Sequence, residues 1–531
     1  MRIRWLGRLP YGEAWDLQRA FHEGRANGRS SDDYLLLLEH PPTYTIGRNG
    51  DETHLLADDA LLRELGAELF HVDRGGDITF HGPGQLVGYP ILALPEPRLV
   101  VPYVRRLEEA LVGALGDLGV AAWTDDGYTG VWTDEGKVAA IGVRVSRGVT
   151  MHGFAVNLDT DLGFFEHINP CGLARPVTSL VEILGRKVSH EEFIDVLVPW
   201  FVKVFEVDEV EEQRAAFVRG TGRVFDVDER MLNIQPSEQV VVRGRLAGEP
   251  PRPDWMKVKA VMDDSYLDLK KLMRSQSLNT VCEEAGCPNI YECWGSGTAT
   301  LMLLGDTCTR ACSFCDVKTG KPGEVDILEP LRAAEAVAQM GLKHAVMTSV
   351  NRDDLPDGGA GIFAQTIEEI NRRLPECDVE VLIPDFKGDK EALEIVMAAK
   401  PTVLNHNTET VLRLQRDIRT AANYGRSLAL LARAKWHNPA GLVKSGLIVG
   451  MGETEGEVLG ALADLRAVGV DVVTIGQYLR PTRRHRPIDR YVHPDEFAAY
   501  SAEGKRLGIG HVEAGPLVRS SYHAREAVAA L

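Results

Sequence analysis

Six of the eight cysteines in this chain fall within one short stretch, "TVCEEAGCPNIYECWGSGTATLMLLGDTCTRACSFC". They form two groups of three with the spacings C-x4-C-x5-C and C-x3-C-x2-C, namely Cys282, Cys287, Cys293, Cys308, Cys312 and Cys315. Zinc usually takes four Cys or His ligands arranged as close pairs, and neither group contains a histidine. Three thiolates suit a cubane iron–sulfur cluster that leaves one iron open for a substrate. On spacing alone, the alternatives are two electron-carrying clusters completed by remote ligands, or a zinc module.

Cys171 stands apart from these groups, in "FFEHINPCGLARPVTSL". A lone cysteine is more often a small buried hydrophobic residue, but the flanking Pro and Gly place this one in a turn, which suits core packing poorly. A nucleophilic thiol needs a lowered pKa, which a nearby cation can supply. Lys137, at the start of "KVAAIGVRVS", is a candidate for that cation, and an ordinary surface lysine is the alternative. The glycine-rich "DRGGDITFHGPGQLVGYP" predicts a turn-rich loop that lets backbone approach a ligand.

The elements that must position the lone cysteine form a mixed α/β first half. Leu, Ile and Val enrichment predicts strands over residues 33–40 and 137–146. Apolar residues at helical spacing predict a helix over 104–118, and a second helix is expected over 190–205. After these elements the sequence loses any sustained period and ends in Gly and Pro, so we predict a connector over residues 213–250.

The two cysteine groups lie at the start of the second half of the chain. In this half, strand and helix patterns alternate. Strands are predicted over residues 298–304, 344–350, 380–386, 402–407, 444–451, 471–478 and 511–515. Repeated strand–helix units imply a parallel sheet, closed or partly closed as a barrel, which works at the carboxyl ends of its strands. The C-x3-C-x2-C group directly follows the first of these strands.

The composition of the 531 residues, with 44% hydrophobic and 26% charged, is typical of a soluble protein of two or three domains. A net charge of −18 argues against nucleic-acid binding, and the short apolar runs argue against a membrane span. The N-terminus lacks an apolar signal core, so we expect a cytoplasmic protein whose cysteines bind metal rather than form disulfides. The arginine-rich stretch "LRPTRRHRPIDR" is either a solvated basic loop or a dock for an acidic protein partner.

"CTRACSFC" is similar to the signature of radical S-adenosylmethionine enzymes. The resemblance implies that Cys308, Cys312 and Cys315 hold a [4Fe–4S] cluster whose open iron takes the methionine part of S-adenosylmethionine. In that family one electron from the cluster cleaves the sulfonium and yields a 5′-deoxyadenosyl radical. The implied fold is a partial TIM-type (β/α)6 barrel.

"VCEEAGCPNIYEC" resembles the auxiliary-cluster motif of lipoyl synthases, as do "TSVNRDDLPDGGAG", "NHNTETV", "QYLRPT" and "GPLVRSSYHA". The resemblance covers residues 251–531. It implies a second [4Fe–4S] cluster held by Cys282, Cys287, Cys293 and Ser521, and sulfur insertion at C6 and C8 of an octanoyl chain. An electron donor such as ferredoxin or flavodoxin is implied as a partner.

The motifs "RGGDITFHGPGQ", "GKVAAIGVRVS", "TMHGFAVN" and "INPCGL" resemble those of octanoyltransferases, over residues 1–212. The resemblance implies a biotin/lipoate-ligase-like α+β domain in which Cys171 carries an acyl thioester and Lys137 lowers its pKa. The residues implied to line the acyl site are Arg74, Gly75, Gly76, Asp77, Ile78, Thr79, Phe80, His81, Ala140, Ile141, Gly142, Gly153, Phe154 and Ala155.

Together the two resemblances imply a fusion of consecutive enzymes of lipoate assembly. The expected acyl donor is octanoyl-acyl carrier protein. The expected acceptors are lipoyl domains of 2-oxoacid dehydrogenase complexes and the glycine cleavage H protein. The rival interpretation is an ATP-dependent lipoate ligase, which would not need Cys171, joined to a two-cluster electron carrier.

Overall fold

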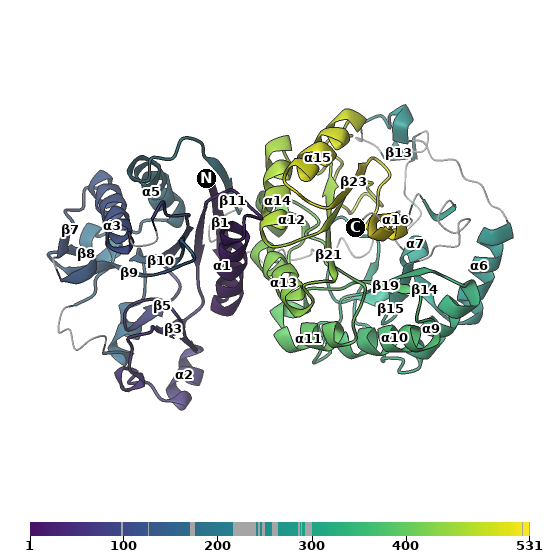
Figure 1. Cartoon of the computed structure of the whole chain (residues 1–531), viewed down its shortest axis with the longest axis horizontal. Coiled ribbons are helices and arrows are strands. Elements are labelled where there is room, and N and C mark those ends of the chain that lie inside the picture. The colour runs from purple at the N-terminus through teal and green to yellow at the C-terminus, as the bar shows by residue number, and fades with distance from the viewer. Residues whose placement is uncertain are drawn as a thin grey trace. The chain divides into compact units, whose positions relative to one another are not determined.

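The computed structural model of the chain divides into two compact units, Met1–Ala215 and Ala216–Leu531, each described here by itself (Figure 1). It describes residues 1–96, 99–125, 127–169, 176–215, 241–242, 245–246, 250–256, 264–284, 287, 289–291, 300–522, 524–529 and 531. Cys171 and Cys293 therefore lie outside the described residues, as does most of the predicted connector. Among the described residues, no helix is both long and apolar enough to cross a membrane.

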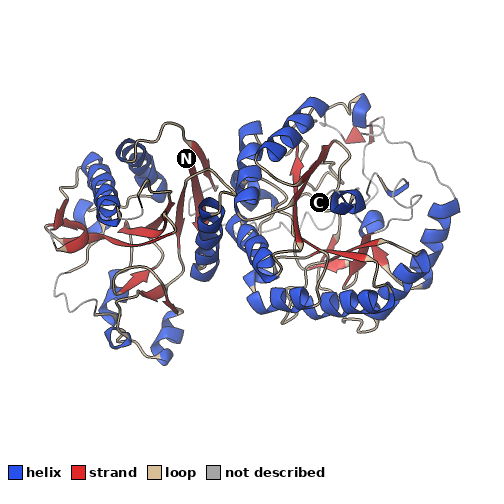
Figure 2. Ribbon diagram, in the orientation of Figure 1, coloured by secondary structure: helices blue, strands red, loops and turns tan. Residues whose placement is uncertain are grey.

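The first unit is built on a mixed eight-stranded sheet in the order β11-β1-β2-β6-β10-β9-β8-β7 (Figure 2). Its strands are β1 (Arg2–Arg8), β2 (Tyr34–Glu39), β6 (Gln85–Ile91), β7 (Trp123–Asp125), β8 (Tyr128–Thr133), β9 (Gly136–Ser146), β10 (Val149–Asn157) and β11 (Glu211–Arg214). The strands predicted over 33–40 and 137–146 are thus confirmed as β2 and β9. Every residue of β2 is buried, which is why it reads as an uninterrupted apolar run.

A second, three-stranded sheet has the order β4-β3-β5. Its strands are β3 (Thr43–Ile46), β4 (Glu68–His71) and β5 (Ile78–His81). It has a small core of its own, in which Phe80 stacks on Phe164 with 4.5 Å between the ring centroids. β5 carries residues 78–81 of the glycine-rich stretch, so pairing with β3 fixes the position of this part of the stretch.

Helices of the first unit pack on the large sheet. α1 (Tyr11–Ala26) packs against β6 and β10, and α3 (Val100–Asp117) packs against β8 and β9. α3 confirms the helix predicted over 104–118, and α5 (His190–Val204) confirms the one over 190–205. The buried side of α3 is the predicted apolar stripe, and the hydroxyl of Ser189 caps α5 by accepting from the backbone N–H of Glu192.

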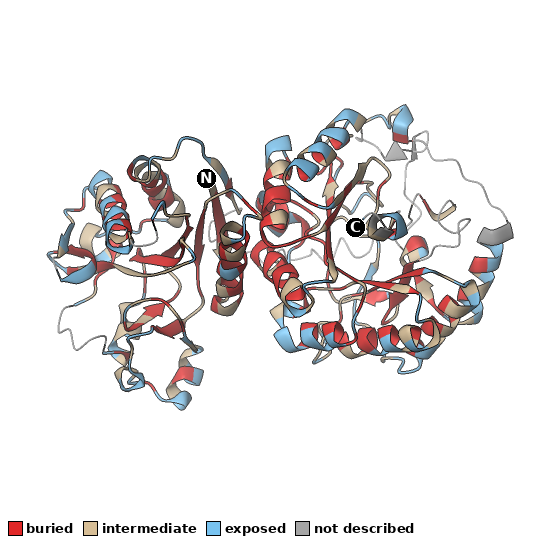
Figure 3. Cartoon of the chain, viewed as in Figure 1, coloured by how far each residue is buried: buried red, intermediate tan, exposed pale blue. Residues whose placement is uncertain are grey.

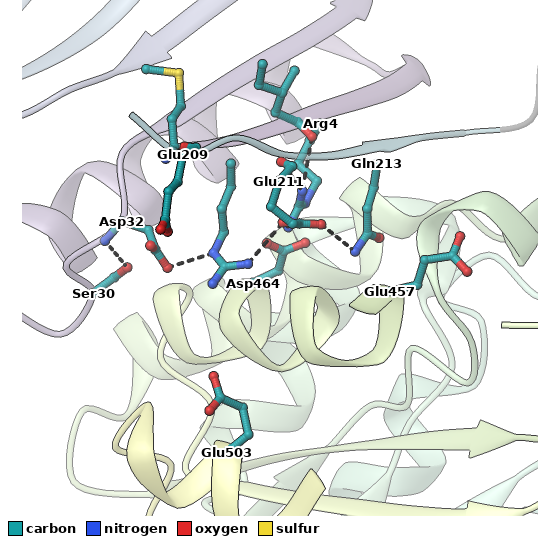
Figure 4. A network of polar contacts seen from close by, with 12 residues as sticks. Arg4, Ser30, Asp32, Glu209, Glu211, Gln213, Glu457, Asp464 and Glu503 are labelled. Atoms are coloured by element: carbon teal, nitrogen blue, oxygen red, sulfur yellow. Dashed lines mark hydrogen bonds and ion pairs between the residues drawn. The ribbon is translucent and has the colours of Figure 1, made fainter. Parts of the chain in front are cut away.

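β11 closes the edge of the large sheet next to β1, and an ion network fastens it there (Figure 4). The Glu211 carboxylate contacts Arg4 at 2.6 Å and Arg2 at 3.0 Å, and Arg2 also contacts Asp32 at 2.6 Å. Gln213 donates to the same glutamate at 2.9 Å. Gln213 and Arg214 still pair with β1, so the sheet extends two residues past the predicted boundary at 212.

The second unit is built on an eight-stranded sheet in the order β14-β15-β18-β19-β20-β21-β22-β23. Its strands are β14 (Asn279–Thr280), β15 (Thr300–Leu303), β18 (His344–Ser349), β19 (Asp378–Leu382), β20 (Val403–Asn405), β21 (Leu442–Val449), β22 (Val472–Gln477) and β23 (His511–Gly515). β14 is antiparallel, and all the others run parallel. β23 adds a parallel strand beyond the six of the expected (β/α)6 barrel.

Helices between the parallel strands cover the outside of this sheet. They are α9 (Glu329–Met340), α10 (Ala360–Arg373), α11 (Lys390–Ala398), α13 (Tyr424–His437), α14 (Glu455–Ala467) and α15 (Pro494–Arg506). They are buried on the side that faces the sheet and exposed on the outer side (Figure 3). The strand predicted over 380–386 is wrong at its end. β19 stops at Leu382, and Phe386, with φ +46°, begins a 3-10 turn that a strand cannot contain.

Candidate active sites

The C-x3-C-x2-C cysteines lie in the loop that follows β15, and all three line one cavity of about 940 Å³. The other walls come largely from the carboxyl ends of the parallel strands, including Ser349 of β18 and Gln477 of β22. Because these ends meet at one edge of the sheet, residues distant in sequence surround the thiols. We call residues 308–315 the cluster loop.

Backbone N–H groups point at the first thiol of the cluster loop. The sulfur of Cys308 accepts from the N–H of Arg310 at 3.4 Å and from the N–H of Asn351 at 3.3 Å. The N–H of Thr309 in turn donates to the carbonyl of Asn351 at 3.0 Å. N–H groups at a sulfur stabilise its thiolate form, so this position suits a metal ligand.

The Arg310 side chain anchors the cluster loop to two neighbouring strand ends. Its guanidinium contacts both carboxylate oxygens of Asp353 at 2.7 and 2.8 Å, and the carboxylate of Asp385 at 2.7 Å. Arg310 and Asp385 are buried, so these charges are paired in a region of low polarity. The neighbouring guanidinium lowers the pKa of Asp385 to about 2, although burial alone would raise it. Sequence reasoning missed this anchor, because neither aspartate is near Arg310 along the chain.

Two thiols of the cluster loop, those of Cys312 and Cys315, favour the neutral form unless a cation is bound. Burial raises the pKa of Cys312 to about 11 and that of Cys315 to about 12, and the neighbouring thiolates add to the rise at Cys315. Among the described residues, no three His, Cys, Asp or Glu side chains close around a single metal ion. A cubane cluster needs less convergence, because each thiolate binds an iron atom of its own.

The two described cysteines of the first group, Cys282 and Cys287, lie in a segment beside the one that carries Ser521. Cys282 is buried in α7 (Val281–Glu284), and its carbonyl accepts from the N–H of Cys287 at 3.0 Å. Asn289 donates to the carbonyl of Leu517 at 2.7 Å, which ties this segment to the turn after β23. Burial raises the pKa of the Cys287 thiol, whereas the nearby cation Arg519 opposes that rise.

A second cavity, of about 840 Å³, lies in the first unit. Lys137 and most of the predicted acyl-site residues line it; these are Arg74, Gly76, Asp77, Ile78, Thr79, His81, Ala140, Ile141, Gly142, Gly153, Phe154 and Ala155. Gly75 does not line the cavity but donates to the Val143 carbonyl at 2.9 Å, and Phe80 packs in the core of the small sheet. The structure thus brings together residues from three separate motifs.

Strand pairing explains why two of these motifs meet. In the β9–β10 pair, Gly142 lies opposite Gly153, and Ala140 lies opposite Ala155. A side-chain carbon added to Gly142 would approach the Arg74 side chain and the Gly75 carbonyl to 3.0 Å, so a larger residue here would push the glycine-rich loop away from β9. Arg74 is held in turn by the carbonyl of Thr45 at 2.7 Å and its hydroxyl at 2.8 Å.

Lys137 opens β9 and reaches the cavity past Gly130. Its backbone N–H donates to the Pro176 carbonyl at 2.9 Å, and its Nζ lies 5.2 Å from the Trp132 ring centroid. Cys171 lies outside the described residues. The described residues on either side of that gap, Asn169 and Pro176, both line the same cavity as Lys137.

Aromatic and imidazole rings that sequence reasoning did not select complete this cavity. Tyr11, Tyr89 and His152 line it, and Tyr11 stacks on His81 with 5.9 Å between centroids. Burial holds the pKa of His81 well below its usual value, so its ring is neutral, and Nδ1–H donates to the Gln85 side-chain oxygen at 2.8 Å. The motif "TMHGFAVN" contains His152 and could have indicated it.

Comparison with known proteins relates each of the two units to a known family. Residues 302–476 match the family model of the radical SAM superfamily. A lipoyl synthase from Rubrobacter xylanophilus is 55% identical over 292 residues, covering 55% of this chain and 91% of the relative. The chain belongs to the lipoyl synthase family. Another lipoyl synthase, from Koribacter versatilis, is 57% identical over 276 residues, covering 52% of this chain and 91% of the relative.

The lipoyl synthase part is preceded by a second catalytic domain. Residues 10–202 match the lipoyl protein ligase A/B catalytic domain, so the chain joins such a domain to a radical SAM lipoyl synthase. Among solved structures, it is similar to a putative lipoate protein ligase from T. acidophilum with bound lipoic acid. That likeness has 17% identity and a TM-score of 0.34, and covers 41% of this chain and 90% of that one. The resemblance to a biotin/lipoate-ligase-like domain joined to a radical SAM domain is confirmed.

Radical SAM membership implies S-adenosylmethionine and a [4Fe–4S] cluster, and the residues of this lipoyl synthase fit them. Three thiols share one cavity, and two backbone N–H groups point at one of their sulfurs. Burial raises the pKa of the Cys312 and Cys315 thiols, so both need a nearby cation to ionise. Iron is such a cation. Cys308, Cys312 and Cys315 would hold the cluster.

We predict that Arg310→Lys lowers cluster occupancy and S-adenosylmethionine cleavage by about tenfold or more, because lysine cannot hold both aspartates in the same planar geometry. Iron content and the paramagnetic resonance of the reduced cluster measure the loss. A background with Cys282, Cys287 and Cys293 replaced by alanine leaves only the cluster-loop signal. Arg372→Lys, an exposed partner of Glu369 in α10, is the matched control. Normal occupancy in Arg310→Lys would show that the anchor is dispensable.

Proposed function

We propose that this chain carries out two consecutive steps of lipoate assembly. Its first part transfers an octanoyl group from acyl carrier protein through Cys171 to a lysine of an apo lipoyl domain. Its second part inserts two sulfurs at C6 and C8 of that octanoyl group. The observation that carries the proposal is that a lipoyl protein ligase A/B catalytic domain and a lipoyl synthase share one chain. We place them at residues 1–212 and 251–531, with a connector over 213–250.

The reaction proposed for the cavity of the first unit is acyl transfer through a thioester. The Cys171 thiolate attacks the carbonyl of the octanoyl thioester, the new sulfur–carbon bond forms, and the carrier thiolate leaves and takes up a proton. The lysine amine of the lipoyl domain then attacks the enzyme thioester, forms the amide and returns the Cys171 thiol. Lys137 supports this assignment, because a cation at the cavity favours the thiolate.

The apolar part of the cavity lining suits a saturated acyl chain. Apolar side chains of Val87, Ile141, Phe154 and Leu162 lie in its walls. Polar groups are fewer and better defined. Among them, the Asp77 carboxylate lies 2.7 Å from His54, and His81 is held by Gln85. An apolar cavity with a few oriented polar groups is typical of sites that bind a small organic group.

The second part requires S-adenosylmethionine and, in our proposal, two [4Fe–4S] clusters. When bound, they supply the radical chemistry that unactivated C–H bonds require, together with the sulfur. This chain's residues hold the groups: Cys308, Cys312 and Cys315 one cluster, and Cys282, Cys287, Cys293 and Ser521 the other. The proposed partners are octanoyl-acyl carrier protein, lipoyl domains of 2-oxoacid dehydrogenases, the glycine cleavage H protein and a ferredoxin or flavodoxin.

Intact mass of a purified lipoyl domain tests the proposal. The full chain is incubated with octanoyl-acyl carrier protein and the apo domain, without ATP, and then with S-adenosylmethionine and reductant. We expect one octanoyl addition, followed by exchange of two hydrogens for two sulfurs. The alternative for the first part, an ATP-dependent ligase, requires ATP and free acid and forms no acyl-enzyme. Acylation only with ATP and free octanoate would therefore favour the ligase.

We predict that Gly130→Ala reduces octanoyl transfer by about tenfold or more, because a 1 Å displacement of a positioned group costs up to about a hundredfold. An added carbon at Gly130 would lie 2.5 Å from Cε of Lys137 and 2.6 Å from the Ala139 carbonyl. Gly119→Ala is the control, since Gly119 also has a positive φ, has nothing within 4 Å of the added carbon and is not among the residues that line the cavity. Initial rates of domain acylation measure the effect. Equal rates in both variants would show that octanoyl transfer does not depend on the position of the Lys137 side chain.

A further inference from the structure

Residues 480–486, "RPTRRHR", form a short basic segment that the two proposed reactions do not use. We call it the arginine loop. It lies between β22 and α15 and contains four arginines and a histidine but no acidic residue, in a chain whose net charge is −18. Arg483 and Arg484 are exposed. A concentration of positive charge on an acidic protein creates a local field that attracts acidic partners.

The arginine loop has a defined conformation. The Arg480 guanidinium donates to the His485 carbonyl at 2.9 Å and also to the Arg483 carbonyl. The Tyr478 hydroxyl donates to the Arg486 carbonyl at 2.8 Å, and the Arg486 side chain donates to the Met451 carbonyl at 2.9 Å. A loop held in this way presents its exposed arginines in fixed positions, which reduces the entropy lost when a partner binds.

Hydrogen bonds join the arginine loop to the cluster loop. The His485 Nε2 lies 2.9 Å from the Cys315 carbonyl, and its Nδ1 lies 2.9 Å from the Thr482 hydroxyl. The hydroxyl donates to Nδ1, so Nε2–H donates to the carbonyl. The N–H of Arg486 donates to the Ser313 carbonyl at 2.9 Å. Arg480 also lines the cavity with the three cluster-loop cysteines.

We propose that the arginine loop is the docking surface for an acidic one-electron carrier protein, with a flavin or an iron–sulfur centre, that reduces the cluster held by the cluster loop. One electron leaves the reduced carrier and enters the cluster, and no bond is made or broken in this step. The proposal rests on the proposed function of the second part. It names where the reductant binds, which neither the motifs nor the family matches specify.

The contact with the cluster loop favours an electron carrier over the acyl-bearing lipoyl domain as the occupant. An electron must pass between two redox centres, so the carrier has to dock close to the cluster ligands, and Cys315 is one hydrogen bond from this surface. Electron-transfer encounters are small and short-lived, and charge complementarity governs their association rate. Fixed arginines beside the cluster ligands satisfy both requirements.

The test compares a protein reductant with a small-molecule reductant on the full, reconstituted chain. In Arg483→Glu/Arg484→Glu, we expect cluster reduction by reduced flavodoxin to slow by tenfold or more at low salt. Reduction by dithionite, and S-adenosylmethionine cleavage with dithionite, should stay within twofold of the parent. The parent's rate with flavodoxin should fall as salt rises, and the variant's rate should be nearly independent of salt. Arg372→Glu/Arg506→Glu, at exposed positions in α10 and α15, controls for the change in net charge.

Three results would overturn the proposal. Equal slowing with dithionite would show that the arginines hold the cluster loop in place. Unchanged reduction, with lipoyl formation lost on an octanoylated domain but kept on an octanoylated peptide, would assign the surface to the lipoyl domain. No change with either reductant would leave a solvated basic loop. If flavodoxin reduces the cluster of the parent but the parent forms no lipoyl group, the proposed function fails. The docking proposal is then still tested by the rate of cluster reduction.

Discussion

The Cys171→Ala protein is expected to lose octanoyl transfer by about a thousandfold or more, because the thioester cannot form without the nucleophile and removal of a nucleophile is among the costliest changes to an enzyme. Iron content and S-adenosylmethionine cleavage should remain at the level of the parent, since all proposed cluster ligands lie beyond residue 281 in the other unit. Mass spectrometry of the chain after exposure to octanoyl-acyl carrier protein should show the octanoyl adduct on the parent alone.

Cys377→Ala is the matched control for this experiment. Cys377 is buried at the amino end of β19, and its thiol donates weakly to the Asp378 carbonyl at 3.5 Å. The control should keep both activities. Loss of iron or of cofactor cleavage in Cys171→Ala would contradict the division into two independent active sites. Persistent transfer without an adduct would point to direct transfer between the two substrates.

The Ser521→Ala protein is expected to keep octanoyl transfer and S-adenosylmethionine cleavage but to form little or no lipoyl group. Three cysteines leave one iron of the second cluster without a thiolate ligand. A serine oxygen is a harder ligand than a thiolate and is more easily displaced from iron in a sulfur cage. Such a ligand suits a cluster that must give up sulfur. Iron analysis should show an incomplete or labile second cluster.

The structure supports this prediction through the neighbours of Ser521. Asn289 bonds to Leu517, and Arg519 lies close enough to Cys287 to influence its thiol, so the serine segment is adjacent to the segment that carries Cys287. Ser520→Ala is the control, because Ser520 is the adjacent residue and lines the cavity of the cluster-loop cysteines. Normal lipoyl formation by Ser521→Ala, with loss in Ser520→Ala, would transfer the assignment to the neighbouring hydroxyl.

The sequence alone determined the elements and the chemical groups. A buried strand such as β2 and a helix such as α5 appear directly in the pattern of apolar residues, because periodicity is set by the residues within the element itself. The same holds for the two cysteine groups, because the cysteines of each group lie within a dozen residues of one another. Local spacing was therefore sufficient to predict the alternation of strands and helices and to single out the two cysteine groups, whereas the kind of cluster was implied by the resemblance to known families.

Only the tertiary structure decided which distant residues share a site. The Arg310–Asp353 contact spans 43 residues, the His485–Cys315 contact 170, and the Asn289–Leu517 contact 228. No periodic signal extends over such separations. The first two contacts exist because parallel strands bring the loops at their carboxyl ends to one edge of the sheet, whatever their distance along the chain. In the first unit the register of β9 and β10 does the same for Gly142 and Gly153. Register depends on how the strands pair, which local residue types do not specify by themselves.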